Sequence, residues 1–78
     1  MNRLFELVEE IFEIGRNDYS EETVINEIET WDSLKHMEFI VSIENRFEIT
    51  LMGDEIAALR TIRDVKSQII AKGAGNDA

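Results

Sequence analysis

Residues 31–47 read WDSLKHMEFIVSIENRF, and this stretch predicts the central helix of the fold. At 3.6 residues per turn, its apolar side chains fall on two stripes rather than one. The first stripe contains Phe39, Ile40, Ile43 and Phe47. The second contains Leu34, Met37 and Val41, flanked by Glu38 and Glu44. Such a helix either lies in the centre of a bundle or has one apolar stripe left over for another purpose.

The start of this helix carries two polar residues with different abilities. Asp32 is a good N-cap, because its carboxylate can accept hydrogen bonds from otherwise unpaired backbone N–H groups. Ser33 follows at the first turn, where those N–H groups and the positive end of the helix dipole favour a phosphate group. A phosphodiester on Ser33 Oγ would lie in that field. The alternative is that Asp32 or Ser33 serves only as the cap, since both residue types are common there for capping alone.

An amphipathic helix and a long loop are expected before the central helix. Apolar residues recur at helical spacing from Leu4 to Phe12, and Gly15 is the expected stop. Residues 16–32 have weaker periodicity and are expected to form a loop. Its apolar residues should pin that loop to the core: Val24, Ile25, Ile28 and Trp31.

Two further helical segments are expected after the central helix. A short helical turn should lie near residues 54–59. The last helix should begin at Thr61, where Thr61 and Asp64 approximate a capping box, and should end at Gly73. Its expected apolar face comprises Ile62, Val65, Ile69 and Ile70. The predicted fold is therefore all-α, a four-helix bundle with three main helices, one short helix and a long first loop. We expect a single domain over residues 1–72 and a flexible C-terminal tail over 73–78.

Composition narrows the classes of function. The chain has 78 residues and no cysteine, which excludes disulfides, thiolate metal ligands and cysteine nucleophiles. Its formal charge of −9 argues against binding to nucleic acid or to anionic membranes and favours a basic protein partner. No apolar run approaches membrane-spanning length, and Glu6, Glu9 and Glu10 interrupt the segment where a signal peptide would be apolar. We therefore expect a cytoplasmic protein.

Metal binding and catalysis have only partial signals. A calcium-loop register is matched by four residues, Asp18, Ser20, Glu22 and Glu29. Thr23 stands where that loop needs glycine, so we expect loose neutralisation by divalent cations and no specific metal site. Ser33 and His36 could share a helix face as a nucleophile and base pair. Because the sequence lacks a Gly-x-Ser-x-Gly elbow and an evident oxyanion site, we expect no catalytic activity.

The chain resembles the acyl carrier protein family from the first expected helix to the last, most closely between Trp31 and Val65. The strongest part is Asp32-Ser33-Leu34, continuing as Lys35-His36-Met37-Glu38-Phe39-Ile40 and then Ile43-Glu44 and Phe47. The similarity continues through Ile49, Leu51, Asp54-Glu55, the Leu59–Val65 stretch and Ile69. Asp-Ser-Leu alone is a weak tripeptide, but this apolar pattern and a Thr-capped last helix make the resemblance specific.

The resemblance implies a carrier whose Ser33, framed by Asp32 and Leu34, receives 4′-phosphopantetheine from coenzyme A. A phosphopantetheinyl transferase would attach the arm, whose thiol would carry an acyl or aminoacyl group as a thioester. The family pattern places the face read by partner enzymes at Leu34, Met37, Glu38, Val41 and Glu44. It places Ile43, Leu51, Ile56 and Leu59 along the interior, which can hold a carried chain. The implied partners are a loading enzyme and downstream biosynthetic enzymes with basic surfaces, acting on a monomeric carrier.

Departures from the family pattern bear on the pathway. Residues 29–31 read ETW where many fatty-acid carriers have glycine and aspartate-rich residues, Lys35 adds a positive charge, and Met52 stands where proline is common. These differences favour a discrete carrier of a dedicated pathway, such as secondary-metabolite or cell-surface biosynthesis, over the housekeeping fatty-acid role. An aminoacyl or peptidyl carrier is the alternative for the cargo. A helical interaction module that never receives the arm is the alternative of a different class.

Overall fold

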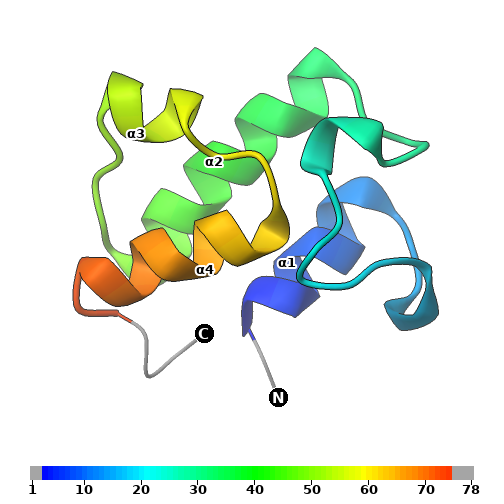
Figure 1. The fold of residues 1–78 in the computed structure, drawn as a ribbon, viewed down its shortest axis with the longest axis horizontal. Coiled ribbons are helices and arrows are strands. Elements are labelled where there is room, and N and C mark those ends of the chain that lie inside the picture. The colour runs from blue at the N-terminus through cyan, green and yellow to red at the C-terminus, as the bar shows by residue number, and fades with distance from the viewer. Residues whose placement is uncertain (1–2, 75–78) are drawn as a thin grey trace.

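Four α-helices and a long first loop make up residues 3–74, the part of the chain that this computed structural model describes. The elements are α1 (Arg3–Phe12), η1 (Arg16–Asp18), η2 (Ile25–Glu27), α2 (Ser33–Phe47), α3 (Gly53–Ala57) and α4 (Ile62–Ala71), where η denotes a 3₁₀ helix. The helix α3 has five residues, whereas the other α-helices have ten to fifteen. The predicted all-α bundle of three main helices and one short helix is therefore confirmed (Figure 1). Residues 75–78 of the expected tail lie outside the described residues.

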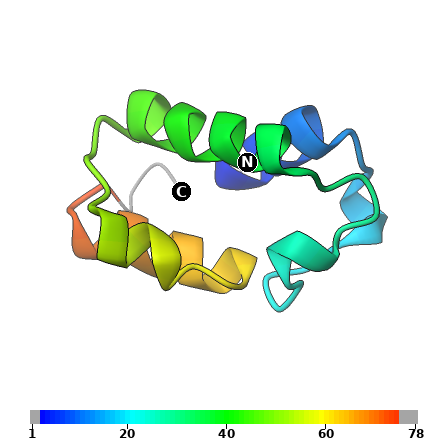
Figure 2. The same ribbon diagram turned by 90° about the horizontal axis from the view of Figure 1, so that it is seen from above.

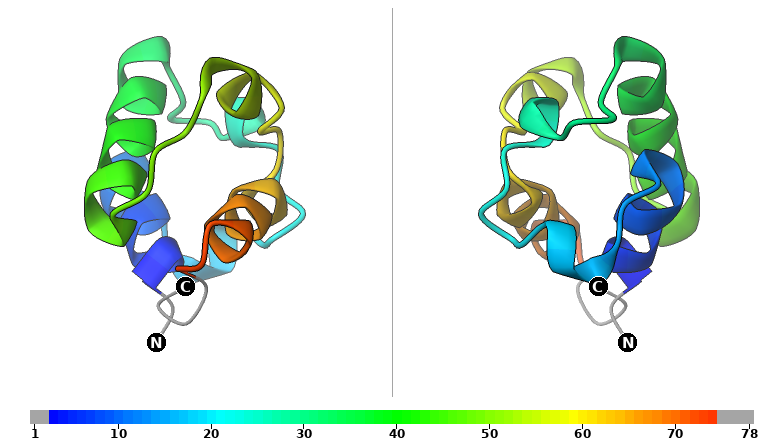
Figure 3. Two further views of the ribbon diagram at one scale, coloured as in Figure 1. Left: turned by 90° about the vertical axis from the view of Figure 1, so that its left-hand side faces the viewer. Right: turned by 90° about the vertical axis from the view of Figure 1, so that its right-hand side faces the viewer.

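The helices α1 and α2 lie side by side and run antiparallel. At one end, Arg3 Nη2 donates to the Arg46 carbonyl at 3.1 Å. At the other end, Lys35 Nζ lies 3.4 Å from Glu13 Oε2. In Figure 2, these two helices form one side of the molecule, and α3, α4 and η2 form the other. The core is therefore enclosed between two layers, with the elements arranged around it in the end-on views of Figure 3.

One apolar stripe of α2 supplies the centre of the core. Its four residues, Phe39, Ile40, Ile43 and Phe47, are all buried. The rings of Phe12 and Phe39 meet edge-on with centroids 5.4 Å apart, joining α1 to α2. The second stripe stays in solvent, since Leu34, Met37 and Val41 are 70%, 57% and 48% exposed. The helix α2 therefore has a second apolar stripe that the core does not use.

The long first loop is held by apolar anchors and by backbone hydrogen bonds. Ile25 and Ile28 are buried, as the sequence predicted. The Ile25 N–H also donates to the Arg60 carbonyl at 2.8 Å, and Val24 forms an isolated antiparallel bridge with Thr61. The loop is therefore paired with the start of α4, a contact between segments far apart in the sequence.

The end of α1 differs from the prediction. The helix ends at Phe12, and Glu13 takes the left-handed backbone conformation with φ of 56°. Gly15 has an extended backbone and precedes η1, so its assignment as the helix stop was wrong. The Thr30 hydroxyl donates to the Phe12 carbonyl, one of the groups that a helix end leaves without an internal partner. A contact from the far end of the loop thus helps to end α1.

The last helix follows the prediction except at one residue. Thr61 Oγ1 accepts from the Asp64 N–H at 3.2 Å, and Asp64 Oδ2 accepts from the Thr61 N–H at 3.0 Å, which confirms the capping box. Gly73 adopts φ of 86° just after the helix, as expected for a stop. Ile70 is 53% exposed, so its assignment to the apolar face was wrong. It lies about 100° around the helix from the buried Ile69, and α4 contacts the core along a narrow stripe only.

The acidic loop and the basic last helix meet at Glu21. Lys66 Nζ lies 3.2 Å from Glu21 Oε2, and Arg63 Nε lies 3.5 Å from Oε1. The hydrogen bond from Lys66, aided by Arg63, lowers the pKa of Glu21 below its ordinary value of 4.5, although desolvation opposes this effect. Part of the acidic excess of the loop is therefore neutralised by α4.

We predict that Glu21→Gln lowers the melting temperature at neutral pH by about 2–4 °C, because a partly exposed ion pair contributes modestly. A carboxyl group with a lowered folded-state pKa stabilises the fold above its ordinary value of 4.5. That contribution is lost as the pH falls through the lowered pKa, so the difference between variant and wild type should shrink there. The control is Glu22→Gln, whose side chain is 76% exposed and lies 3.7 Å from Arg63. A Glu21 effect that is independent of pH would contradict this account.

Candidate functional site

Asp32 sets the start of α2. Its backbone is extended, and its Oδ1 accepts from the Lys35 N–H at 2.7 Å. Its carbonyl accepts from the His36 N–H at 3.0 Å, the first hydrogen bond of the helix. Asp32 is therefore the N-cap, and Ser33 is the first helical residue. This geometry decides between the two residues that the sequence left as alternatives for the cap.

Ser33 is exposed and has no structural duty of its own. Among residues 3–74, no hydrogen bond engages its hydroxyl, and Leu34 beside it is 70% exposed. The backbone N–H groups of a first helical turn lack internal partners and create a positive local field. A phosphate ester on Ser33 Oγ would lie in this field and reach into solvent. The residues at the start of α2 therefore fit a phosphate-linked prosthetic group.

Lys35, which departs from the family pattern, forms an ion pair within the fold. Its ammonium forms the ion pair with Glu13 just beyond α1, and its side chain is only 25% exposed. The positive charge is thus balanced by a carboxylate at the contact between α1 and α2. Lys35 serves the packing of the two helices, which accounts for a basic residue at this position.

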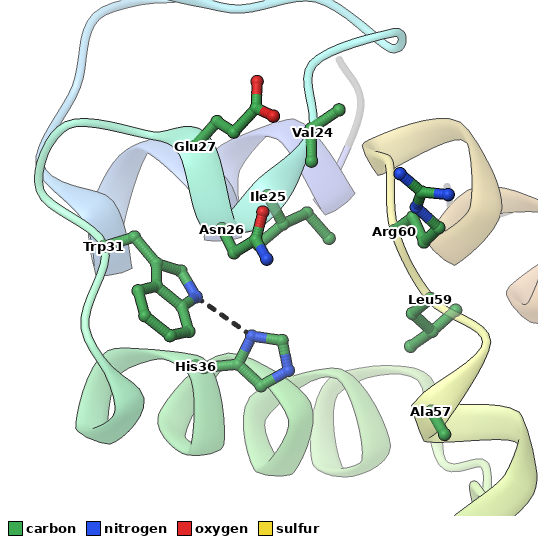
Figure 4. Close-up of a pocket in the computed structure, with 9 residues that line it drawn as sticks. All are labelled: Val24, Ile25, Asn26, Glu27, Trp31, His36, Ala57, Leu59 and Arg60. Atoms are coloured by element: carbon green, nitrogen blue, oxygen red, sulfur yellow. Dashed lines mark hydrogen bonds between the residues drawn. The ribbon is translucent and has the colours of Figure 1, made fainter.

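His36 is paired with Trp31, a contact that the sequence did not predict. Trp31 Nε1 donates to His36 Nδ1 at 3.1 Å, and the rings meet edge-on with centroids 5.9 Å apart (Figure 4). An indole N–H can only donate, so Nδ1 must accept and the proton of the neutral ring lies on Nε2. Neither nitrogen is then placed to remove a proton from Ser33. The only signal in the sequence was a tryptophan and a histidine five residues apart across a helix cap.

A pocket of about 360 Å³ lies beside this pair, between η2, the start of α2 and the link from α3 to α4 (Figure 4). Its lining residues come from these three segments: Val24, Ile25, Asn26, Glu27, Trp31, His36, Ala57, Leu59 and Arg60. Its polar groups include an amide, a carboxylate, an imidazole and a guanidinium. The sequence did not predict this pocket, because the three segments are brought together only by the fold.

The residues predicted to form the partner face are only partly grouped by the structure. Met37, Glu38 and Val41 line a shallow groove of about 320 Å³ with Ser42, and Leu34 lies exposed one turn earlier on α2. Glu44 is half-buried instead, and its Oε2 accepts from the Leu51 N–H at 2.9 Å. The carboxylate of Glu44 therefore braces the link that follows α2.

Two acidic residues of the calcium-loop register have partners within the fold. Asp18 Oδ2 accepts from the Gly15 N–H at 2.9 Å, and Glu22 lies near Arg63. Within residues 3–74, no group of three or more His, Asp or Glu side chains is arranged to hold a metal ion. In the same part of the chain, no helix is long and apolar enough to cross a membrane.

Comparison with known proteins defines the class to which this fold and site belong. Residues 2–69 match the family model described as the phosphopantetheine attachment site, so the expected covalent cofactor is 4′-phosphopantetheine. The acyl carrier protein of Exiguobacterium sibiricum is 45% identical over 38 residues, which cover 49% of this chain and 48% of that protein. The match thus spans about half the length of the curated relative. The chain belongs to the acyl carrier protein family, whose members act as carriers and are generally not catalysts.

We predict that Asp32→Ala lowers the free energy of unfolding by about 1 kcal/mol, the usual cost of removing an N-cap side chain. Ser33→Ala is the matched control, because it removes a neighbouring polar group that caps nothing, and it should change stability little. Urea unfolding followed by circular dichroism measures both. A larger loss in Ser33→Ala than in Asp32→Ala would show that the cap was assigned to the wrong residue.

Proposed function

We propose that this protein is an acyl carrier whose Ser33 bears 4′-phosphopantetheine and delivers a thioester-linked acyl group to biosynthetic enzymes. The observation that supports the proposal is that one residue at the start of α2 caps the helix while its neighbour offers an exposed hydroxyl. Asp32 caps the helix through the Lys35 N–H, while the Ser33 hydroxyl stays exposed. An Asp-Ser-Leu sequence in which serine is not needed for capping leaves that hydroxyl available for modification.

In this proposal, the residues of the chain supply position and field. Ser33 provides the oxygen of a phosphodiester, and the first turn of α2 provides N–H groups and a dipole that favour its negative charge. The bound cofactor would supply a terminal thiol on which the acyl group is carried. We assign no catalytic role in acyl transfer to His36, since its Nδ1 accepts a hydrogen bond from Trp31. The chemistry on the acyl group is therefore assigned to partner enzymes.

We further propose that the outer face of α2 is the surface read by the transferase, the loading enzyme and downstream enzymes. Leu34, Met37 and Val41 provide exposed apolar contacts, and Glu38 provides a negative charge for basic partner surfaces. Glu44 borders this face, but its contact with the Leu51 N–H means that its replacement should also cost stability. The division of α2 into a buried stripe and an exposed stripe supports this assignment.

The carried group and the pathway are proposed from the net charge of the chain and from the residues that depart from the family pattern. A net charge of −9 supports acyl-type partners. An aminoacyl or peptidyl group is the alternative cargo, and loading tests would distinguish it from an acyl group. Trp31, and Lys35 in its ion pair with Glu13, differ from the housekeeping fatty-acid pattern. We assign the protein to a dedicated fatty-acid, polyketide or related pathway, as a monomeric carrier in the cytoplasm, where the coenzyme A donor is available.

We predict that a phosphopantetheinyl transferase and coenzyme A add a single arm to the wild-type protein, measured by intact mass. Ser33→Ala should show no addition, because its side chain has no hydroxyl. Ser20→Ala and Ser67→Ala are controls that should be modified as fully as the wild type, because both serines are exposed and lie outside the proposed partner face. Modification that persists in Ser33→Ala would reject the attachment site and with it the proposed function.

We predict that Met37→Ala and Val41→Ala reduce transferase kcat/KM while keeping a melting temperature close to that of the wild type. Their side chains lie in solvent, so truncation leaves no core cavity. Ile43→Ala removes a fully buried side chain and should cost about 2–5 kcal/mol of unfolding free energy. Glu38→Lys should slow association and weaken its dependence on salt. If Met37→Ala melts as early as Ile43→Ala, the outer stripe belongs to the core and the partner face lies elsewhere.

A further inference from the structure

Two methionine side chains lie in solvent, in different parts of the molecule. Met37 is 57% exposed on the outer side of α2, and Met52 is 60% exposed at the start of α3. Figure 2 shows α2 and α3 in opposite layers. The two thioethers are therefore similarly open to small reagents, but only Met37 belongs to the proposed partner face.

The chain offers no thiol that would compete with these thioethers. Its sequence has no cysteine, so a peroxide that meets the protein before any arm is attached finds methionine as the oxidisable sulfur. The third methionine, Met1, lies outside the described residues. Within residues 3–74, oxidation of sulfur is therefore confined to Met37 and Met52.

The surroundings of Met37 make its chemical state important for recognition. It lines the groove of about 320 Å³ with Glu38, Val41 and Ser42, and Leu34 is exposed one turn earlier. An unbranched thioether adapts its shape to different apolar partners, which suits a surface that meets several enzymes. A sulfoxide is polar, and burying it in an apolar contact without a hydrogen-bond donor costs free energy. Oxidation of Met37 should therefore weaken that contact.

We propose that Met37 is a reversible oxidation site that controls recognition of this carrier by its partner enzymes. The thioether sulfur attacks one oxygen of hydrogen peroxide, so that an S–O bond forms and the O–O bond breaks. The leaving hydroxide takes the proton of the transferred oxygen and becomes water, and the sulfur loses the two electrons that the peroxide gains. Two thiols, acting through a methionine sulfoxide reductase, then restore the thioether and become a disulfide, with release of water. This inference rests on the proposed function, because it needs the outer stripe of α2 to meet partners.

The test compares transferase kcat/KM for each protein before and after treatment with hydrogen peroxide, so that each variant is its own reference. In the wild type, oxidation should lower kcat/KM about tenfold, the effect of one unpaired polar group in a contact. Met52→Leu keeps Met37 and should show the same loss. Met37→Leu keeps Met52 and should show no loss, whatever its starting kcat/KM. Methionine sulfoxide reductase with a dithiol should restore the oxidised wild type.

Tryptic peptides report the two oxidised residues separately. Cleavage after Lys35, Arg46 and Arg60 places Met37 in residues 36–46 and Met52 in residues 47–60, so a gained oxygen atom can be assigned to either one. The melting temperature of the oxidised wild type should stay close to that of the untreated protein, because neither side chain is part of the core.

The outcomes separate this inference from the proposed function. If the untreated wild type receives no arm, the proposed function itself fails. If it receives the arm but complete oxidation of Met37 leaves kcat/KM unchanged, the oxidation site is overturned while the carrier function stands. An equal loss in Met37→Leu and in the wild type would also overturn it, since the effect would then come from another residue. So would a loss accompanied by early melting, since oxidation would then act on the fold.

Discussion

The hydrogen bond from the Lys35 N–H to the Asp32 carboxylate fixes where α2 begins, and the rest of the structure depends on that position. Each residue of a helix is rotated by about 100° from the one before it. A helix with two apolar stripes could present either stripe to the core if its start shifted. With Asp32 as the cap, Phe39 and Ile43 point inward and are fully buried, while Met37 remains in solvent. The position of the cap and the burial of one stripe are therefore both satisfied by a single orientation of α2.

This orientation gives the different sides of α2 different surroundings. Its inner stripe packs against α1, where Phe12 meets Phe39. Its first residue, Ser33, is exposed in the field of the helix start and is proposed to hold the cofactor. Its outer stripe is proposed to meet partner enzymes, and the side next to η2 carries His36 at the edge of a polar pocket. Changes to the surface of the helix can therefore alter recognition without removing core contacts.

Features set by neighbouring residues were predictable from the sequence, and features set by distant contacts were not. The Asp32 cap follows from local chemistry, and helical periodicity groups Ile43 with Phe39 and Phe47. The interior position of Ile43 was implied by the family resemblance, and both the cap and the burial of Ile43 are confirmed. The end of α1 was not predicted, because Glu13 adopts a positive φ, which is uncommon for a residue other than glycine. At the same place, the hydroxyl of Thr30, from the far end of the loop, donates to the Phe12 carbonyl. The pairing of Trp31 with His36 was missed because it requires the loop to turn back against α2. The sequence could therefore single out Ser33 as the candidate attachment residue, whereas the surroundings of Ser33 depend on contacts that only the fold brings together.

The most direct test of the central claim is to locate the modification within the wild-type chain. After treatment with transferase and coenzyme A, trypsin should release residues 17–35 as one peptide, because Arg16 and Lys35 bound a stretch without other basic residues. This peptide contains both Ser20 and Ser33, so tandem mass spectrometry compares an exposed loop serine with the serine at the helix start in one molecule. The account predicts that fragment ions place the added mass on Ser33 alone. Added mass on Ser20, or on a serine outside this peptide, would contradict it.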